Sequence, residues 1–181
     1  MRIPTEWAGA YWASNEIALA LLFLAWKCPA VSRILFSVMF LSASVINARL
    51  ALIHPAEYLD YAKFTFLEPY RQFILGYFAE HTQPIVLAIA LGQALIGAFL
   101  LAKRTTKVGA FGASAFLLAI VPLGVGSAFP FSLVCVLALA VMVRQTASAG
   151  HEAKSELAPN LQLGTNGPKR DLSGSALPPF Q

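Results

Sequence analysis

The sequence predicts an all-α protein, a polytopic bundle of transmembrane helices with short amphipathic helices at the membrane surface. From Pro84 to Val143, the only charged residues lie between Lys103 and Lys107. The apolar runs on either side of this cluster are long enough for a helix to cross a hydrocarbon core of roughly 30 Å. Only 12% of the residues are charged and 57% are hydrophobic, whereas about a quarter of a soluble domain is charged. The chain therefore has no room for a separate soluble catalytic domain.

Five apolar segments follow one another within residues 1–144, which we treat as one transmembrane domain. They are residues 7–26, 34–53, 84–102, 108–128 and 130–143. The first has aromatic residues at both ends, as membrane-interface belts do, but Asn15 and Glu16 interrupt it. The sequence thus leaves open whether there are four spans or five. The last segment is shorter than the roughly 20 residues of a usual span, so we expect it to lie in thinned membrane, to lean on its neighbours, or to have Arg144 snorkel to the headgroups.

Residues 54–83 form an amphipathic segment in which aromatic residues alternate with charged ones. Such a pattern suits helices that lie in the interface, with rings in the headgroup layer and charges in water. Because Pro69 divides the segment, we expect two short helices, at about 56–67 and 69–78. Two roles remain open for them, a surface anchor and a cap that lines an entrance for a lipid-like molecule.

The remaining residues, 145–181, are rich in Ser, Gly, Pro, Asn and Ala. They contain too few apolar residues to build a core. We therefore predict a disordered cytoplasmic tail.

The positions of Lys and Arg predict the orientation. Lys27 and Arg33 lie between the first two segments, the cluster at 103–107 follows the third, and Arg144 ends the fifth. The positive-inside rule places these three sites in the cytoplasm, which makes residues 54–83 extracytoplasmic and the C-terminus cytoplasmic. We expect a multi-pass protein of a bacterial cytoplasmic membrane. Because no basic stripe with interleaved aromatic residues is present, we expect no nucleic-acid partner.

Polar residues inside the spans are the candidate functional residues, since an ionisable group in hydrocarbon costs several kcal/mol and tends to be paired or to face a cavity. The four candidates are Glu16, Asn47, Arg49 and Gln93. With a rise of about 1.5 Å per residue, Glu16 and Gln93 fall near the membrane middle, and Asn47 and Arg49 lie towards the outer face. These positions allow a polar cluster in the outer half of the bundle. The alternatives are that Arg49 snorkels to the headgroups and that the two amides only join helices.

The familiar catalytic motifs are absent from the sequence. Cys28 and Cys135 lie near opposite ends of the bundle, and no CxxC pair, P-loop, dinucleotide fingerprint or HExxH helix is present. We therefore predict no catalytic residues, no metal and no cofactor, and an enzymatic role remains open.

Small residues mark the surfaces at which helices pack closely. Ala90, Ala94 and Ala98 recur every four residues, with Gly97 beside them, and such ridges let helices approach in lipid. The Pro- and Gly-rich stretch at 121–133 predicts a helix that loosens at the outer face before the chain re-enters the membrane.

Four stretches together carry a resemblance to a known family. They are NARLALIHPAEY (47–58), EPYRQFILGYF (68–78), PIVLAIALGQALIG (84–97) and PLGVGSAFPFSL (122–133). In layout and character, residues 33–143 resemble the DoxX-like family of small four-helix membrane proteins. The resemblance implies a four-helix core, to which this chain adds an N-terminal segment and a tail. Members of the family include subunits associated with quinone-linked oxidoreductases, but no redox-active pair carries over to this chain.

Two classes of function follow from these observations. The polar groups and packing surfaces without a catalytic set favour a non-enzymatic accessory or scaffold protein that assembles with a membrane protein partner in the lipid bilayer. The alternative is a protein that binds a quinone or another lipid-soluble ligand, or that passes a small solute.

Overall fold

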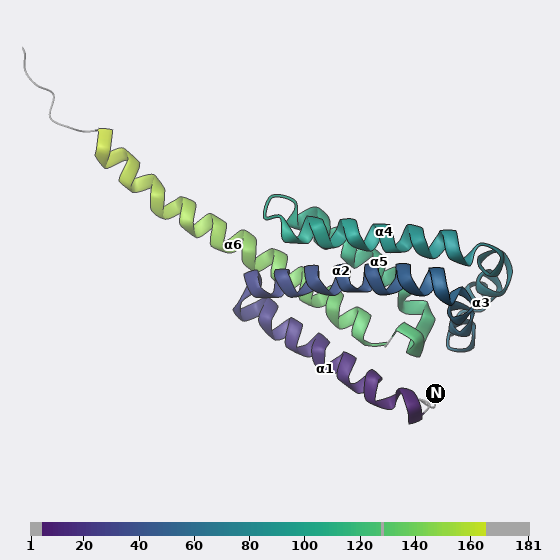
Figure 1. The fold of residues 1–181 in the computed structure, drawn as a ribbon. Helices are drawn as coiled ribbons and strands as arrows, with labels where there is room; N and C mark the ends of the chain where they lie inside the picture. Colours follow the sequence, from purple (N-terminus) through teal and green to yellow (C-terminus); the bar gives the residue numbers. More distant parts are fainter. Residues whose placement is uncertain (1–4, 128, 166–181) are drawn as a thin grey trace, which may run out of the picture. The chain divides into compact units, whose positions relative to one another are not determined.

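The computed structural model describes residues 5–127 and 129–165, and this part of the chain contains helices and no strand. The long helices are α1 (Thr5–Lys27), α2 (Pro29–Ile53), α4 (Thr82–Leu101), α5 (Thr106–Ile120) and α6 (Phe131–Thr165). The short ones are η1 (Pro55–Lys63), α3 (Glu68–Phe73), η2 (Ile74–Phe78) and η3 (Val121–Ser127) (Figure 1). The predicted all-α bundle is confirmed.

Among the described residues, four helical stretches are long and apolar enough to cross a membrane. They are Pro29–Ile53, Thr82–Leu101, Thr106–Gly124 and Phe131–Ser148. They overlap the second to fifth predicted spans and make this a multi-pass membrane protein. The first predicted span also forms a helix, α1, but it is not among the four, and Asn15 and Glu16 are the residues that make it less apolar.

The C-terminal part of the chain differs from the expected arrangement. The helix α6 does not end at Arg144 but continues to Thr165, so its apolar stretch reaches the length of a span and no thinned membrane is required. The chain divides into two compact units, one of residues 1–146 and one of residues 147–181. The described part of the second unit, up to Thr165, is helical, whereas disorder was predicted from residue 145. Residues 166–181 of the predicted tail lie outside the described residues.

A row of hydrogen bonds joins α2 to α4. Arg33 donates to the carbonyl oxygen of Leu100 at 3.0 Å and to that of Leu101, which satisfies acceptors that the end of α4 leaves without an intrahelical partner. The Ser37 hydroxyl donates to the Gly97 carbonyl oxygen at 2.7 Å, and Ser44 donates to that of Ala90 at 2.6 Å. The donors on α2 recur at helical spacing, so they lie on one face. The two helices therefore run antiparallel and pack closely.

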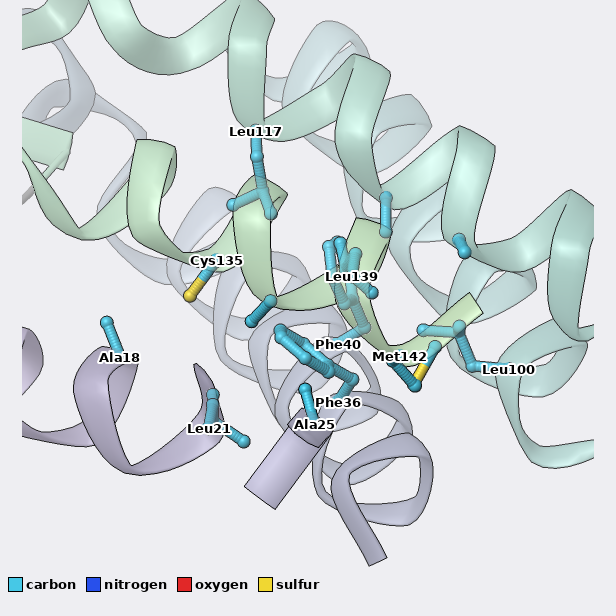
Figure 2. Close-up of a cluster of buried hydrophobic side chains, with 13 residues drawn as sticks. Ala18, Leu21, Ala25, Phe36, Phe40, Leu100, Leu117, Cys135, Leu139 and Met142 are labelled. Atoms are coloured by element: carbon cyan, nitrogen blue, oxygen red, sulfur yellow. The ribbon is translucent and has the colours of Figure 1, made fainter. Parts of the chain in front are cut away.

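The main hydrophobic core joins side chains from all five long helices (Figure 2). From α1 it takes the stripe Ala18, Leu21 and Ala25, which recurs every three or four residues. The phenyl rings of Phe36 and Phe40 on α2 fill its centre and are at most 2% exposed. The remaining members are Leu100, Ala110, Ala113, Leu117, Cys135, Ala138, Leu139 and Met142. Phe116 and Ile120 on α5 pack against this core and also line the cavity described below, so the core supports one wall of that site.

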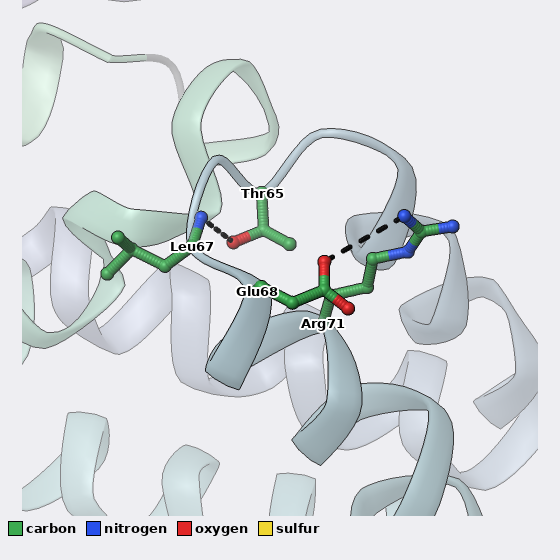
Figure 3. Close-up of polar contacts among 4 residues, drawn as sticks. All are labelled: Thr65, Leu67, Glu68 and Arg71. Atoms are coloured by element: carbon green, nitrogen blue, oxygen red, sulfur yellow. Dashed lines mark hydrogen bonds and ion pairs between the residues drawn. The ribbon is translucent and has the colours of Figure 1, made fainter.

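The segment between α2 and α4 is tied to the end of α5. The Thr65 hydroxyl donates to the Pro122 carbonyl oxygen at 2.7 Å and accepts from the Leu67 backbone N–H at 3.4 Å, and the Tyr70 hydroxyl donates to the Ala119 carbonyl oxygen at 2.9 Å. Figure 3 shows Thr65 beside the exposed ion pair of Glu68 and Arg71, whose charged atoms are 4.0 Å apart. These residues, 54–81, therefore lie over one end of the helices, and we call them the covering segment. They form η1 and the consecutive helices α3 and η2, near the two predicted ranges.

The loosened end of α5 is confirmed. The helix passes into the 3-10 turn η3, in which Gly124 has φ 62° and ψ −127°. A backbone at this positive φ favours glycine, because a side chain would be strained there. The turn stops the helix below the covering segment and leaves Leu123 beside it.

Candidate functional site

A cavity of about 400 Å³ lies between the covering segment and the helices α2, α4 and α5. Its lining is almost wholly aromatic and aliphatic, with amides only from Asn47 and Gln93. The lining residues are Asn47, Tyr58, Tyr61, Tyr70, Phe73, Ile74, Phe78, Ile85, Val86, Ile89, Gln93, Phe116, Ala119, Ile120 and Leu123. Sites for small molecules are commonly apolar hollows of about 300–1,000 Å³ with a few polar groups that orient the ligand.

A three-residue polar network lies in the wall of the cavity. The Asn47 Nδ2 group donates to Gln93 Oε1 at 2.8 Å, and the Tyr58 hydroxyl donates to Asn47 Oδ1 at 2.8 Å. The network thus joins α2, α4 and η1. Gln93 is only 3% exposed, so its amide is a buried polar group whose hydrogen bonds matter to stability.

The phenols of Tyr58 and Tyr61 stay neutral at physiological pH, because both pKa values are raised. Burial, followed by the negative potential of Tyr61 and of Glu57, raises the pKa of Tyr58 to about 12. Burial also raises the pKa of Tyr61. Because both pKa values lie above the ordinary value of about 10, the hydroxyl of Tyr58 remains a donor to Asn47.

Two of the four predicted site residues come together and two do not. Asn47 and Gln93 are bonded in the cavity wall. Arg49 is exposed on α2, because two residues along a helix turn the side chain by about 200° and place it on the other side. Glu16 is exposed on α1, which presents its buried stripe to the core and lies apart from the lining. The predicted cluster is therefore corrected to the pair of amides.

The sequence left open that the aromatic segment lines an entrance for a lipid-like molecule, but it did not connect Tyr58 with Asn47 or identify the lining residues on α5. Tyr58 follows Asn47 by eleven residues, across the end of α2, and no local spacing rule connects the two. The lining residues Phe116, Ala119 and Ile120 recur at three- and four-residue steps on α5, but the same pattern is expected of any packed helix. Among the described residues, no three His, Cys, Asp or Glu side chains gather as a metal site would require.

Comparison with known proteins adds no further information. No protein-family model, curated protein or solved structure matches this chain.

Proposed function

We propose that this protein binds a lipid-soluble ligand, such as a quinone-like molecule, in the cavity between α2, α4, α5 and the covering segment. The observation that carries the proposal is the combination of about 400 Å³ of apolar space with two hydrogen-bonded amides in its wall. In a bundle that served only as a scaffold, packing would be expected to fill this space, because voids forfeit dispersion contacts. The ligand-binding alternative left open by the sequence is thus better supported than the accessory or scaffold role.

The proposal includes a DoxX-like architecture and a place in the bacterial cytoplasmic membrane. Its support is the layout of four apolar helices with an aromatic surface segment between the first and second of them. Lys103, Arg104 and Lys107 lie at the turn between α4 and α5, at the end of the bundle opposite the covering segment. The positive-inside rule then puts that turn and the C-terminus in the cytoplasm.

Cysteine labelling tests this orientation. A cysteine at Thr105 should react with an impermeant thiol reagent only after the cytoplasmic side has been opened, whereas a cysteine at Thr65 should react in intact cells. Both variants are made in a Cys28→Ser background, because Cys28 is exposed. The reverse labelling pattern would invert the topology, and the cavity would then open towards the cytoplasm.

Filling the cavity tests the binding function. The Ala119→Phe variant places a ring in the space while keeping the Ala119 carbonyl that Tyr70 uses. We expect a neutral small molecule to co-purify in mild detergent with the wild-type protein and to be lost from this variant. Solvent extraction followed by mass spectrometry measures the molar ratio of that molecule to protein.

Ala115→Phe is the matched control. Ala115 is exposed on the same helix one turn earlier and does not line the cavity, so this variant should retain the molecule. Equal amounts in all three proteins would place the molecule outside the cavity. If no molecule co-purifies while the same partner protein is captured by all three, the scaffold function takes the place of this proposal.

A further inference from the structure

The two amides of the polar network differ in how many of their hydrogen-bonding groups have partners. Asn47 has both ends of its amide engaged, with Nδ2 donating to Gln93 and Oδ1 accepting from Tyr58. Gln93 uses only its oxygen, and its Nε2 group donates to no residue in the part of the chain that the structure describes. One amide group with two N–H donors is therefore left in the wall of the cavity.

This donor is available to the cavity. Among the described residues, the side-chain atom that is both fully enclosed and without a hydrogen-bond partner is Asn15 Oδ1. Gln93 Nε2 also has no partner among these residues but is not such an atom, so part of its surface remains accessible. Gln93 itself is 97% buried, with 3% of its surface exposed, and it lines the cavity. A buried donor without a partner is unfavourable, and an acceptor atom of a ligand at that point would satisfy it.

The lining also selects against charge. No Asp, Glu, Lys, Arg or His is among the described residues that line the cavity. An ionised ligand group would be buried there without a counter-charge, which is strongly unfavourable. The polar group of a bound ligand is therefore not a carboxylate or a phosphate. A neutral hydrogen-bond acceptor is compatible with this lining.

The donor lies deep in the bundle. Gln93 is about 17 Å along α4 from its Thr82 end, at a rise of 1.5 Å per residue. The aromatic residues Tyr70 and Phe73 line the cavity from the covering segment at that same end. A bound molecule therefore extends from the covering segment towards the middle of α4.

We infer that the ligand is a neutral apolar molecule with a carbonyl-type oxygen at its leading end, which accepts a hydrogen bond from Gln93 Nε2. This inference rests on the proposed function and names its ligand class. The rest of the ligand packs against Val86, Ile89 and Phe116, and Tyr70 and Phe73 cover its trailing end. Gln93 is then the residue that determines specificity, and Asn47 and Tyr58 position it.

Three probes of similar shape test the inference on the unaltered protein. They are acetylnaphthalene, which carries a ketone, ethylnaphthalene, which lacks the oxygen, and naphthoate, which is charged. Binding to the full chain in lipid nanodiscs is measured by equilibrium dialysis, with empty nanodiscs subtracted to remove partition into lipid. We expect the ketone to bind about tenfold more tightly than the hydrocarbon, the effect of one hydrogen bond, and naphthoate not to bind at the site.

The infrared carbonyl stretch reports the hydrogen bond directly. The bound ketone should absorb at a lower frequency than the same ketone in empty nanodiscs, and the Gln93→Met variant should abolish this shift and the tenfold preference. Gln83→Met, on the exposed first turn of α4 and outside the lining, should change neither. An unshifted stretch in the wild-type protein would overturn the assignment without the use of any variant.

The outcomes separate this inference from the proposed function. If ketone and hydrocarbon bind equally, and Ala119→Phe removes both, the cavity binds lipid-soluble molecules but Gln93 does not select a carbonyl. Preferred binding of naphthoate would overturn the neutral class. If no probe binds beyond partition into lipid, the inference and the proposed function fail together.

Discussion

Replacing Gly109 with alanine is expected to lower the free energy of unfolding in detergent by about 2–3 kcal/mol, the effect of overpacking a close contact. A Cβ atom at Gly109 would lie 2.7 Å from the backbone nitrogen of Leu100 and 3.0 Å from the carbonyl carbon of Phe99. These are backbone atoms at the end of α4 and cannot turn aside as a side chain does. Either α4 and α5 move apart, or the short turn between them is distorted.

The control for this prediction is Gly92→Ala on α4. A Cβ at Gly92 meets no atom within 4 Å, so only helix propensity changes, which favours alanine by up to about 1 kcal/mol. Unfolding is followed by circular dichroism as the denaturing detergent is increased. If the two variants lost stability equally, helix packing at Gly109 would not explain the effect.

Replacing Asn47 with leucine is expected to cost about 1–3 kcal/mol, because it removes the centre of the polar network. Gln93 loses the donor to its Oε1 atom, and the Tyr58 hydroxyl loses its acceptor at Asn47 Oδ1. The covering segment should loosen at the same time, because Tyr58 is one of its attachments to α2. Amide hydrogen exchange in η1 should therefore rise together with the loss of stability.

The matched variant for Asn47→Leu is Arg49→Leu. Arg49 is exposed on the same helix and lies outside the cavity lining, so this change should alter stability by no more than about 0.5 kcal/mol. A large loss of stability in Arg49→Leu would mean that Arg49 does interact with the polar cluster, contrary to its exposed position on α2. A neutral Asn47→Leu would mean that the network is not needed to hold α2 against α4.

Hydropathy was sufficient to locate the membrane-spanning helices. The predicted segments 34–53 and 84–102 correspond to α2 and α4 within a few residues at each end, because a span needs a long run of apolar residues and such runs are visible directly in the sequence. The loosened turn at η3 was also predictable, since Pro122 and Gly124 cannot continue a regular helix.

Which face of each helix packs against its neighbours was harder to predict than where the helix lies in the sequence. Membrane depth alone grouped Arg49 with Asn47, but the face of α2 that meets α4 is set by the spacing of Arg33, Ser37, Ser44 and Asn47. The spacing of these polar residues is visible in the sequence. The residues of α4 that they contact could not be predicted, because Ser37 and Ser44 bond to backbone carbonyl oxygens, which every residue type carries.

The cavity itself could not be predicted from the sequence. Whether aromatic and aliphatic side chains fill a space or leave it open depends on how the covering segment sits on the bundle, which the Thr65 and Tyr70 bonds to the end of α5 determine. The extent of α6 was missed for a different reason. Disorder was predicted after residue 145 because the composition there contains too few apolar residues to build a core. A helix can continue without a core, because its backbone hydrogen bonds are local, and α6 extends to Thr165.

The most direct test of the ligand-binding account is a crystal structure of the full chain with acetylnaphthalene at saturating concentration, compared with Ala119→Phe under the same conditions. The account predicts density for one probe molecule between Phe116, Val86 and Ile89, with its ketone oxygen about 3 Å from Gln93 Nε2, and none in the variant. Wild-type protein whose cavity stays without the probe, or is closed by its own side chains, would contradict the account.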